Sequence, residues 1–247
     1  MHSPIRLRPF QHSDLDIFAD AYDKTWGWEL SPDPERPERM RHAFVYVIGN
    51  LLKSDFIRVA ELPDGRPAAL MCARLDPKAE PAAIDVDLTG LRERHQALAA
   101  LQKETELGRS CLGFEEKLHA VNRKMLADYV ARAGGSMEDR PELVFLIAHP
   151  IARRRGCAGA LFRLFESEAR QKGAREAVLF TDNDCVTAIY TRNGWRREGE
   201  IPWKIDENED FKSWLYVKTF CDAGEEGKKS RTGGNMRPAG PVMSNRN

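Results

Sequence analysis

The order of apolar and polar positions along the chain predicts a mixed α/β fold. Short apolar or alternating runs predict strands, in chain order at residues 5–10, 56–62, 66–74, 143–148, 177–181, 195–205 and 213–220. Apolar residues three and four positions apart predict helices between them, at about 13–22, 37–53, 161–172 and 186–193. Helices separate most of the strands. The strands 56–62 and 66–74 follow each other directly and are joined as a β-hairpin by the turn Pro63-Asp64-Gly65, and the last two strands, 195–205 and 213–220, also have no helix between them.

A second helical pattern interrupts this order before the strand at 143–148. Helical periodicity runs over residues 88–107 and again over 114–132, and Gly108 and Gly113 bracket an expected break. We therefore expect an inserted helical hairpin at about 88–133. It either packs on the sheet, forms a dimer surface, or covers a binding site as a lid.

Length and composition indicate one domain and a tail. Residues 1–221 carry the periodic segments and are expected to form a single domain of ordinary composition, in a chain of 247 residues that is 42% hydrophobic and 31% charged. The last 26 residues, 222–247, contain five glycines, two prolines and no aromatic residue. Such a segment buries too little apolar area to offset the entropy of ordering, so we expect it to be disordered.

Charge and cysteine content exclude several classes of protein. The 38 basic residues balance the 38 acidic ones, so the charge does not favour nucleic acid or an anionic membrane as a partner. No apolar run approaches the length of a membrane span, and the first residues lack the apolar core of a signal peptide. Five scattered cysteines without a Cys-x-x-Cys pair fit reduced thiols, so we expect a cytoplasmic protein without a metal site.

The stretch 141–162 is the strongest candidate for a binding site. A buried strand ends at Pro150, a basic turn rich in small residues follows, and a helix begins near Leu161. A strand, a glycine turn and a helix direct unpaired backbone N–H groups and the positive end of the helix dipole at one point. This arrangement suits a phosphate or a pyrophosphate.

Two motifs in this half of the chain resemble a known family. Arg153-x-x-Gly156-x-Ala158 is similar to the acyl-CoA signature of the GNAT superfamily of N-acyltransferases, and Asn183-x6-Tyr190-x3-Gly194-Trp195 is similar to its second signature. The resemblance implies an α/β (α+β) GNAT fold: a mixed central sheet of about six to seven strands, flanked by helices, here with the helical hairpin inserted before the motif strand. The surroundings of Thr181-Asp182-x-x-Cys185 resemble a bacterial subgroup of the superfamily that carries a similar insertion.

The resemblance implies acetyl-CoA as cosubstrate. Backbone N–H groups of the turn hold its pyrophosphate in this family, the strand backbone pairs with its pantetheine amides, and the arginines add electrostatic support. Carried over to this sequence, the expected cofactor-binding residues are Ile147, His149, Arg153, Arg154, Arg155, Gly156, Cys157, Ala158, Gly159, Ala160 and Asn183. The alternatives for Asn183 are ordering of the loop or capping of a helix.

The same resemblance suggests the catalytic groups. Tyr190 aligns with the tyrosine that protonates the departing thiolate in many family members; as an alternative it is a core aromatic residue. Glu142 opens the motif strand and resembles the glutamate base of the histone-acetylating branch, with a surface carboxylate as the alternative. Cys157 and Cys185 have no neighbouring histidine to activate a thiolate, so we expect direct transfer without a thiol intermediate.

The acceptor is the least determined part of the prediction. Residues 11–40 carry a net charge of −5, with Phe18, Tyr22, Trp26 and Trp28 among the acidic residues. An acidic, aromatic wall suits a cationic amine, whereas the alternative is a solvated helix face. We expect an N-acetyltransferase that acts on a small primary amine; a protein lysine or N-terminal acetyltransferase and a non-catalytic acyl-CoA sensor are the alternatives.

Overall fold

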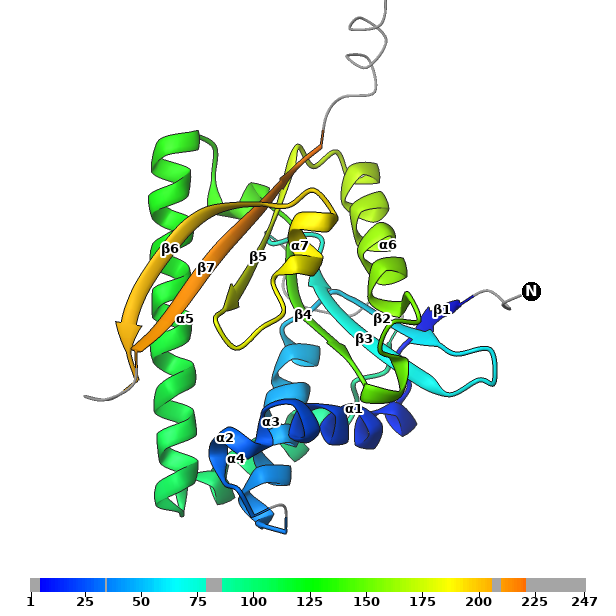
Figure 1. The fold of residues 1–247 in the computed structure, drawn as a ribbon, viewed down its shortest axis with the longest axis vertical. Helices are drawn as coiled ribbons and strands as arrows, with labels where there is room; N and C mark the ends of the chain where they lie inside the picture. The colour runs from blue at the N-terminus through cyan, green and yellow to red at the C-terminus, as the bar shows by residue number, and fades with distance from the viewer. Residues whose placement is uncertain (1–4, 34, 79–85, 206–209, 221–247) are drawn as a thin grey trace, which may run out of the picture.

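A seven-stranded mixed sheet forms the centre of the computed structural model, which describes residues 5–33, 35–78, 86–205 and 210–220 (Figure 1). Its strand order is β1-β2-β3-β4-β5-β7-β6, and only the pair β4 and β5 is parallel. The strands are β1 (Arg6–Pro9), β2 (Phe56–Glu61), β3 (Pro67–Arg74), β4 (Glu142–Ala148), β5 (Glu176–Asp182), β6 (Arg196–Lys204) and β7 (Asp210–Thr219). All seven predicted strands are confirmed, with ends that differ by a few residues.

Helices cover both faces of this sheet. The longer ones are α1 (Leu15–Tyr22), α3 (Pro37–Leu52), α4 (Leu91–Lys103), α5 (Glu106–Ala133) and α6 (Cys157–Gln171); the short ones are α2 (Trp28–Leu30) and α7 (Ala188–Arg192). One core lies between the sheet and α6, around Phe162, Phe165 and Trp195. A second core lies on the opposite face between the sheet, α1 and α3, and a third lies between α5, β5 and β7. No helix in the described ranges is long and apolar enough to cross a membrane.

A bulge and an early end of pairing distinguish strand β4. Cys72 pairs with Phe145 but Ala73 pairs with Leu143, so Val144 is an extra residue in the ladder. The bulge reverses the alternation: Leu143 packs in the α6 core, whereas Phe145 packs against α1 and α3. On the other side, β4 pairs with β5 only at Glu142 and Leu143, although both strands have seven residues. Figure 1 shows the two strands diverging beyond this point.

The predicted insertion contains two helices, but its break was placed wrongly. The break falls at residues 104–105, and both Gly108 and Gly113 lie within α5. The hydroxyl of Thr105 accepts a hydrogen bond from the Gly108 N–H at 3.1 Å and begins the helix as its N-cap. The two helices also contact different partners: α4 packs along α3, whereas α5 crosses β6 and β7 (Figure 1).

Gly108→Ala is expected to destabilise the protein by roughly 2 kcal/mol, because the new methyl group would overpack a tight contact. A Cβ at this position would lie 1.9 Å from the carbonyl oxygen of Gln102. The matched control is Gly113→Ala in the same helix, where no atom lies within 4 Å of the added Cβ. This control should gain about 0.5–1 kcal/mol from helix propensity. Denaturant unfolding measures both values, and equal effects would mean that the turn between α4 and α5 is not tightly packed.

The predicted disorder of residues 222–247 lies outside the described residues.

Candidate active site

The divergence of β4 from β5 opens one edge of β4 in the middle of the sheet. Beyond Leu143 the backbone of β4 has no partner strand on the β5 side within the described ladder. An unpaired edge of this kind offers hydrogen bonds to an extended ligand in the way that an added strand does. Ile147 lies on this part of β4 and is buried.

The turn after β4 leads directly into the N-terminus of α6. Arg154 has a φ of 63°, and Gly156 has a φ of 81° as the N-cap residue. The Arg155 N–H bonds the Ala152 carbonyl and the Ala160 N–H bonds the Gly156 carbonyl, so these two donors are occupied. The first N–H groups of a helix have no partner within it, which leaves those of Cys157, Ala158 and Gly159 directed out of the helix end. The backbone N–H groups that are available to bind an anion are therefore those of the residues around 156–159.

Three consecutive arginines border this helix end. Arg153, Arg154 and Arg155 are exposed, and none of them forms an ion pair with a described residue. Cys157 contributes only its backbone, because its side chain is buried in the α6 core and burial raises the pKa of its thiol. The combination of free cations and a positive helix end favours an anionic ligand.

His149 is tied to the fold by both ring nitrogens. Its Nδ1 accepts a hydrogen bond from the Ile151 N–H at 3.2 Å, so the proton is on Nε2, which donates to Asp20 Oδ2 at 2.9 Å. The imidazole thereby joins the end of β4 to α1. Any contact of His149 with a cofactor is therefore left to its backbone.

Asn183 extends the pairing of β5 with β7. Its Oδ1 accepts from the Lys212 N–H at 2.7 Å, and its own N–H donates to the Lys212 carbonyl at 3.2 Å. Its Nδ2 donates to Asp184. The side chain thus orders the loop after β5, which is the alternative role that the sequence left open.

Tyr190 lies on α7, beside the end of β5. Its ring packs edge-on against Phe162 at 5.9 Å between centroids and against Tyr216 at 5.3 Å. Burial raises the pKa of its hydroxyl above the ordinary value of 10, and the charge of Asp182 acts in the same direction. The phenol is therefore protonated at neutral pH, as a proton donor must be.

Cys185, in the loop before α7, is not set up as a nucleophile. Burial raises the pKa of its thiol, and the nearby Asp182 carboxylate raises it further. Both thiols that were considered for a covalent intermediate, Cys157 and Cys185, are thus held in the protonated form, which agrees with direct transfer.

Glu142 begins β4 at the closed end of the divergence. Its side chain is half-buried, and burial raises the pKa of its carboxyl while the charges of Arg74 and Lys53 lower it. Arg74 is its cross-strand partner on β3. Glu142, whose carboxyl has a raised pKa, therefore lies at the point where β4 and β5 begin to diverge.

Four of the eight carboxylates in the acidic segment 11–40 form ion pairs within the fold. Asp14 binds Arg8 at 2.7 Å, Asp23 binds Arg39 at 2.8 Å, Glu38 lies 3.6 Å from Arg36, and Asp20 binds both Lys24 and His149. Lys24, Arg36 and Arg39 belong to the segment and are already counted in its net charge of −5, so these contacts leave the segment acidic. Recognition of a cationic acceptor by this segment stays a prediction.

Sequence reasoning missed Tyr46 and Glu115, which face the same interior from α3 and α5. The Tyr46 ring packs 5.5 Å from Phe145 of β4. Burial raises the pKa of its hydroxyl, and the charges of Glu115 and Asp182 act in the same direction. The available signal was the spacing of Glu115 four residues after Cys111, on the inner side of α5.

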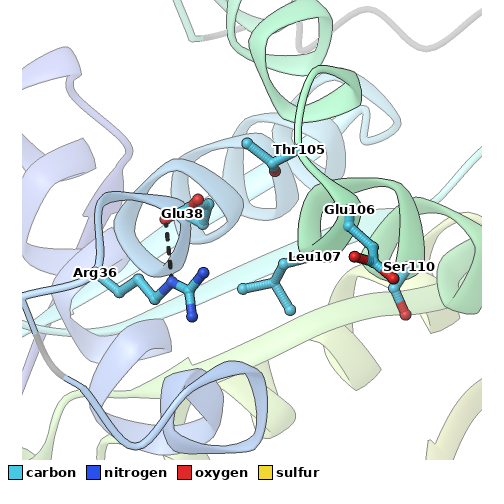
Figure 2. A pocket seen from close by; sticks show the side chains of 6 residues that line it. All are labelled: Arg36, Glu38, Thr105, Glu106, Leu107 and Ser110. Carbon is cyan, nitrogen blue, oxygen red and sulfur yellow. Dashed lines mark ion pairs between the residues drawn. The ribbon is translucent and has the colours of Figure 1, made fainter.

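A cavity of about 350 Å³ lies at the N-terminal end of α5 (Figure 2). Its walls are Arg36 and Glu38 before and in α3, and Thr105, Glu106, Leu107 and Ser110 at the start of α5. Arg36 and Glu38 belong to the acidic segment 11–40 that was considered for the acceptor, whereas none of the predicted cofactor-binding or catalytic residues lines the cavity.

Comparison with solved structures identifies the fold. An agmatine N-acetyltransferase variant in its apo form aligns with a TM-score of 0.51 and 15% identity, over 88% of this chain and 100% of that one. A polyamine N-acetyltransferase of Drosophila melanogaster (TM-score 0.50, 17% identity) and a mosquito arylalkylamine N-acetyltransferase-like protein (TM-score 0.50, 14% identity) have the same coverage. No family model and no curated protein matches the sequence. At this level of identity the likeness shows the fold alone: the chain has the GNAT fold of these N-acetyltransferases.

Proposed function

We propose that the protein is an acetyl-CoA-dependent N-acetyltransferase that acts on a primary amine. The observation that carries the proposal is the divergence of β4 from β5 after Leu143. The α6 N-terminus with its exposed arginines and protonated Tyr190 both lie beside this opening. A pantetheine chain laid along the free edge of β4 would extend from a phosphate-binding helix end toward the tyrosine.

The residues of this chain supply binding, orientation and proton transfer. The nitrogen lone pair of a neutral amine forms a bond to the thioester carbonyl carbon, and the C–S bond breaks with its electron pair on sulfur. Tyr190 gives a proton to that sulfur, and Glu142 takes one from the nitrogen. The products are an N-acetyl amide and the free thiol of coenzyme A.

A small-molecule amine is the acceptor that this structure favours. Three structural neighbours with TM-scores of 0.50 or 0.51 are named as agmatine, polyamine and arylalkylamine N-acetyltransferases. In this chain α5 packs on β6, β7 and α3, and the charge of Glu115 on α5 acts on Tyr46 of α3. We infer that the insertion forms one wall of the acceptor site. Four of the five cysteines are described and are free, in keeping with a cytoplasmic reaction.

Release of thiol from acetyl-CoA tests this function directly. The protein is mixed with acetyl-CoA and a panel of small amines, lysine peptides and peptides with a free N-terminus, and free thiol is followed over time. We expect turnover with at least one small amine. Turnover only with peptides would identify a protein acetyltransferase, and tight acetyl-CoA binding without any turnover would indicate a sensor.

Glu142→Gln is expected to lower kcat about 100-fold at neutral pH, within the range of a lost general base. The wild-type rate should fall as the pH drops through the raised pKa of Glu142, because only the ionised carboxylate accepts a proton. The variant should recover as the pH rises, because bulk solvent then deprotonates the amine. The control is Glu138→Gln, an exposed carboxylate just before the strand. Equal rates for both variants at all pH values would remove Glu142 from the mechanism.

A further inference from the structure

Glu115, on the inserted helix α5, carries a buried oxygen without a hydrogen-bond donor. Its side chain is 18% exposed, and its Oε1 is shielded from solvent and receives no hydrogen bond from the described residues. Buried carboxylates are ordinarily paired or hydrogen-bonded, since an unpaired one lowers the stability of the fold. An unpaired carboxylate in the interior therefore points to a ligand that supplies the missing donor.

His42, the basic side chain nearest to Glu115, does not supply it. Gln102 Nε2 donates to His42 Nδ1 at 2.9 Å, and His42 Nε2 then donates to the Tyr22 hydroxyl at 3.1 Å. Burial lowers the pKa of this histidine to about 4, so it is neutral. Its Nδ1 lies 3.7 Å from Glu115 Oε1, and both atoms are acceptors.

The charge of Lys53 acts on Glu115, but the ammonium group of Lys53 contacts His119. Its Nζ lies 3.0 Å from Nε2 of His119, and it forms no ion pair with Glu115 in the described structure. Burial raises the pKa of Glu115 to about 7, and only Lys53 counteracts this rise. The remaining titratable neighbours from α1, α3 and α5, which are Tyr22, Tyr46 and Cys111, are acids whose pKa values the Glu115 charge raises further.

The charge of Glu115 acts on Tyr46 and on Lys53, and the charge of Glu142 also acts on Lys53. An amine held on a carboxylate also keeps its proton and cannot attack a thioester. A contact with Glu115 therefore suits a cationic group at the end of the acceptor that does not react.

A cavity lies on the same side of α5 as Glu115, toward the start of the helix. Leu107 lines the cavity of about 350 Å³, and Cys111 and Glu115 follow it at intervals of four residues along the helix (Figure 2). Residues at this spacing share one side of a helix. The cavity thus lies about two turns before Glu115.

We propose that Glu115 binds a second cationic group of the acceptor, so that the protein acetylates one amine of a diamine or of a comparable dication. The assignment rests on the proposed acetyl transfer for its reaction, but the binding contact itself does not depend on turnover.

The test compares 1,4-diaminobutane with 1-aminobutane, which lacks only the second amine. In the wild-type protein we expect kcat/KM to be at least about tenfold higher for the diamine, the size of one ionic contact at a buried site. Glu115→Gln should raise KM for the diamine and bring the ratio close to one. Glu116→Gln, an exposed carboxylate on the same helix, is the control and should keep the preference.

Calorimetry of 1,4-diaminobutane binding to the protein saturated with coenzyme A decides the proposal even if no amine is acetylated. Loss of diamine binding in Glu115→Gln, with coenzyme A affinity retained, supports it. Equal binding of the diamine and the monoamine to the wild-type protein would overturn it, as would equal losses for both amines in the variant. Absence of all turnover with intact diamine binding would refute only the acetyl transfer.

A stability measurement excludes a purely structural role and detects misfolding. Because the pKa of Glu115 is raised in the folded state, its ionisation removes stability as the pH rises from about 4.5 to about 7. Glu115→Gln should therefore melt about 5 °C higher than the wild type at pH 8 and show little difference at pH 4.5. A lower melting temperature at pH 8 would mean that the carboxylate holds the fold together and would contradict a role in ligand binding.

Discussion

Gly156→Glu is expected to abolish acetyl-CoA binding, with a loss of affinity of at least about 100-fold. Gly156 is the N-cap residue of α6 and precedes the N–H groups that are directed out of the helix. A carboxylate here would occupy the position of the pyrophosphate and would itself satisfy the positive helix end. Replacing one favourable anion contact by a repulsive one weakens the binding free energy by several kcal/mol. Each 1.4 kcal/mol of binding free energy changes the affinity by about a factor of ten. Equilibrium titration with acetyl-CoA measures the loss.

Gly173→Glu is the matched control for that variant. Gly173 follows the other end of α6 and has a φ of 78°, close to the 81° of Gly156. A Cβ at Gly173 meets no atom within 4 Å, and one at Gly156 meets only Ile5 at 3.6 Å, so both variants fold with similar backbone strain of roughly 1–2 kcal/mol. The control should lose stability but bind acetyl-CoA normally. Equal affinities in the two variants would show that the turn at 153–156 is not the phosphate site.

The strands and their order along the chain could be predicted because the apolar pattern of each short segment is enough to indicate a strand. The run 143–148 is apolar and ends at a proline, and 177–181 is a similar buried strand. Their mutual divergence has no signal in either segment. Pairing of β4 with β5 stops after Leu143, and Val144 is an extra residue opposite β3, and both features depend on how neighbouring strands pair.

Only those parts of the candidate site that lie within a local sequence motif could be predicted from the sequence. The turn at Gly156 and the helix at Tyr190 are close in sequence to their motifs, so a pattern could identify them. The charge of Glu115 acts on Tyr46 because α5 packs against α3 from another part of the chain, and neither residue has a local motif. The ion pairs of Asp14 with Arg8 and of Asp23 with Arg39 could not be predicted from the composition of segment 11–40, because they depend on the folded structure.

Tyr190→Phe is expected to lower kcat by about 100- to 1,000-fold without a change in acetyl-CoA affinity, as for the loss of a general acid. The ring contacts with Phe162 and Tyr216 do not involve the hydroxyl, so phenylalanine keeps the packing. The raised pKa of Tyr190 keeps its proton in place at neutral and moderately alkaline pH. Without that proton the thiolate must leave as an anion into a half-buried site, which raises the barrier. Single-turnover kinetics with a saturating amine measures the effect.

Tyr216→Phe separates loss of the acid from disturbance of the aromatic cluster. Tyr216 is buried on β7, and its ring touches the Tyr190 ring at 5.3 Å between centroids, so this variant also removes one hydroxyl while keeping both rings. It should retain nearly the wild-type kcat. An acyl donor with a more acidic thiol should restore much of the rate of Tyr190→Phe, because its thiolate departs without a proton donor. If kcat of Tyr190→Phe equals that of the wild type, or if the defect persists with the acidic thiol, then Tyr190 packs the core and does not protonate the leaving sulfur.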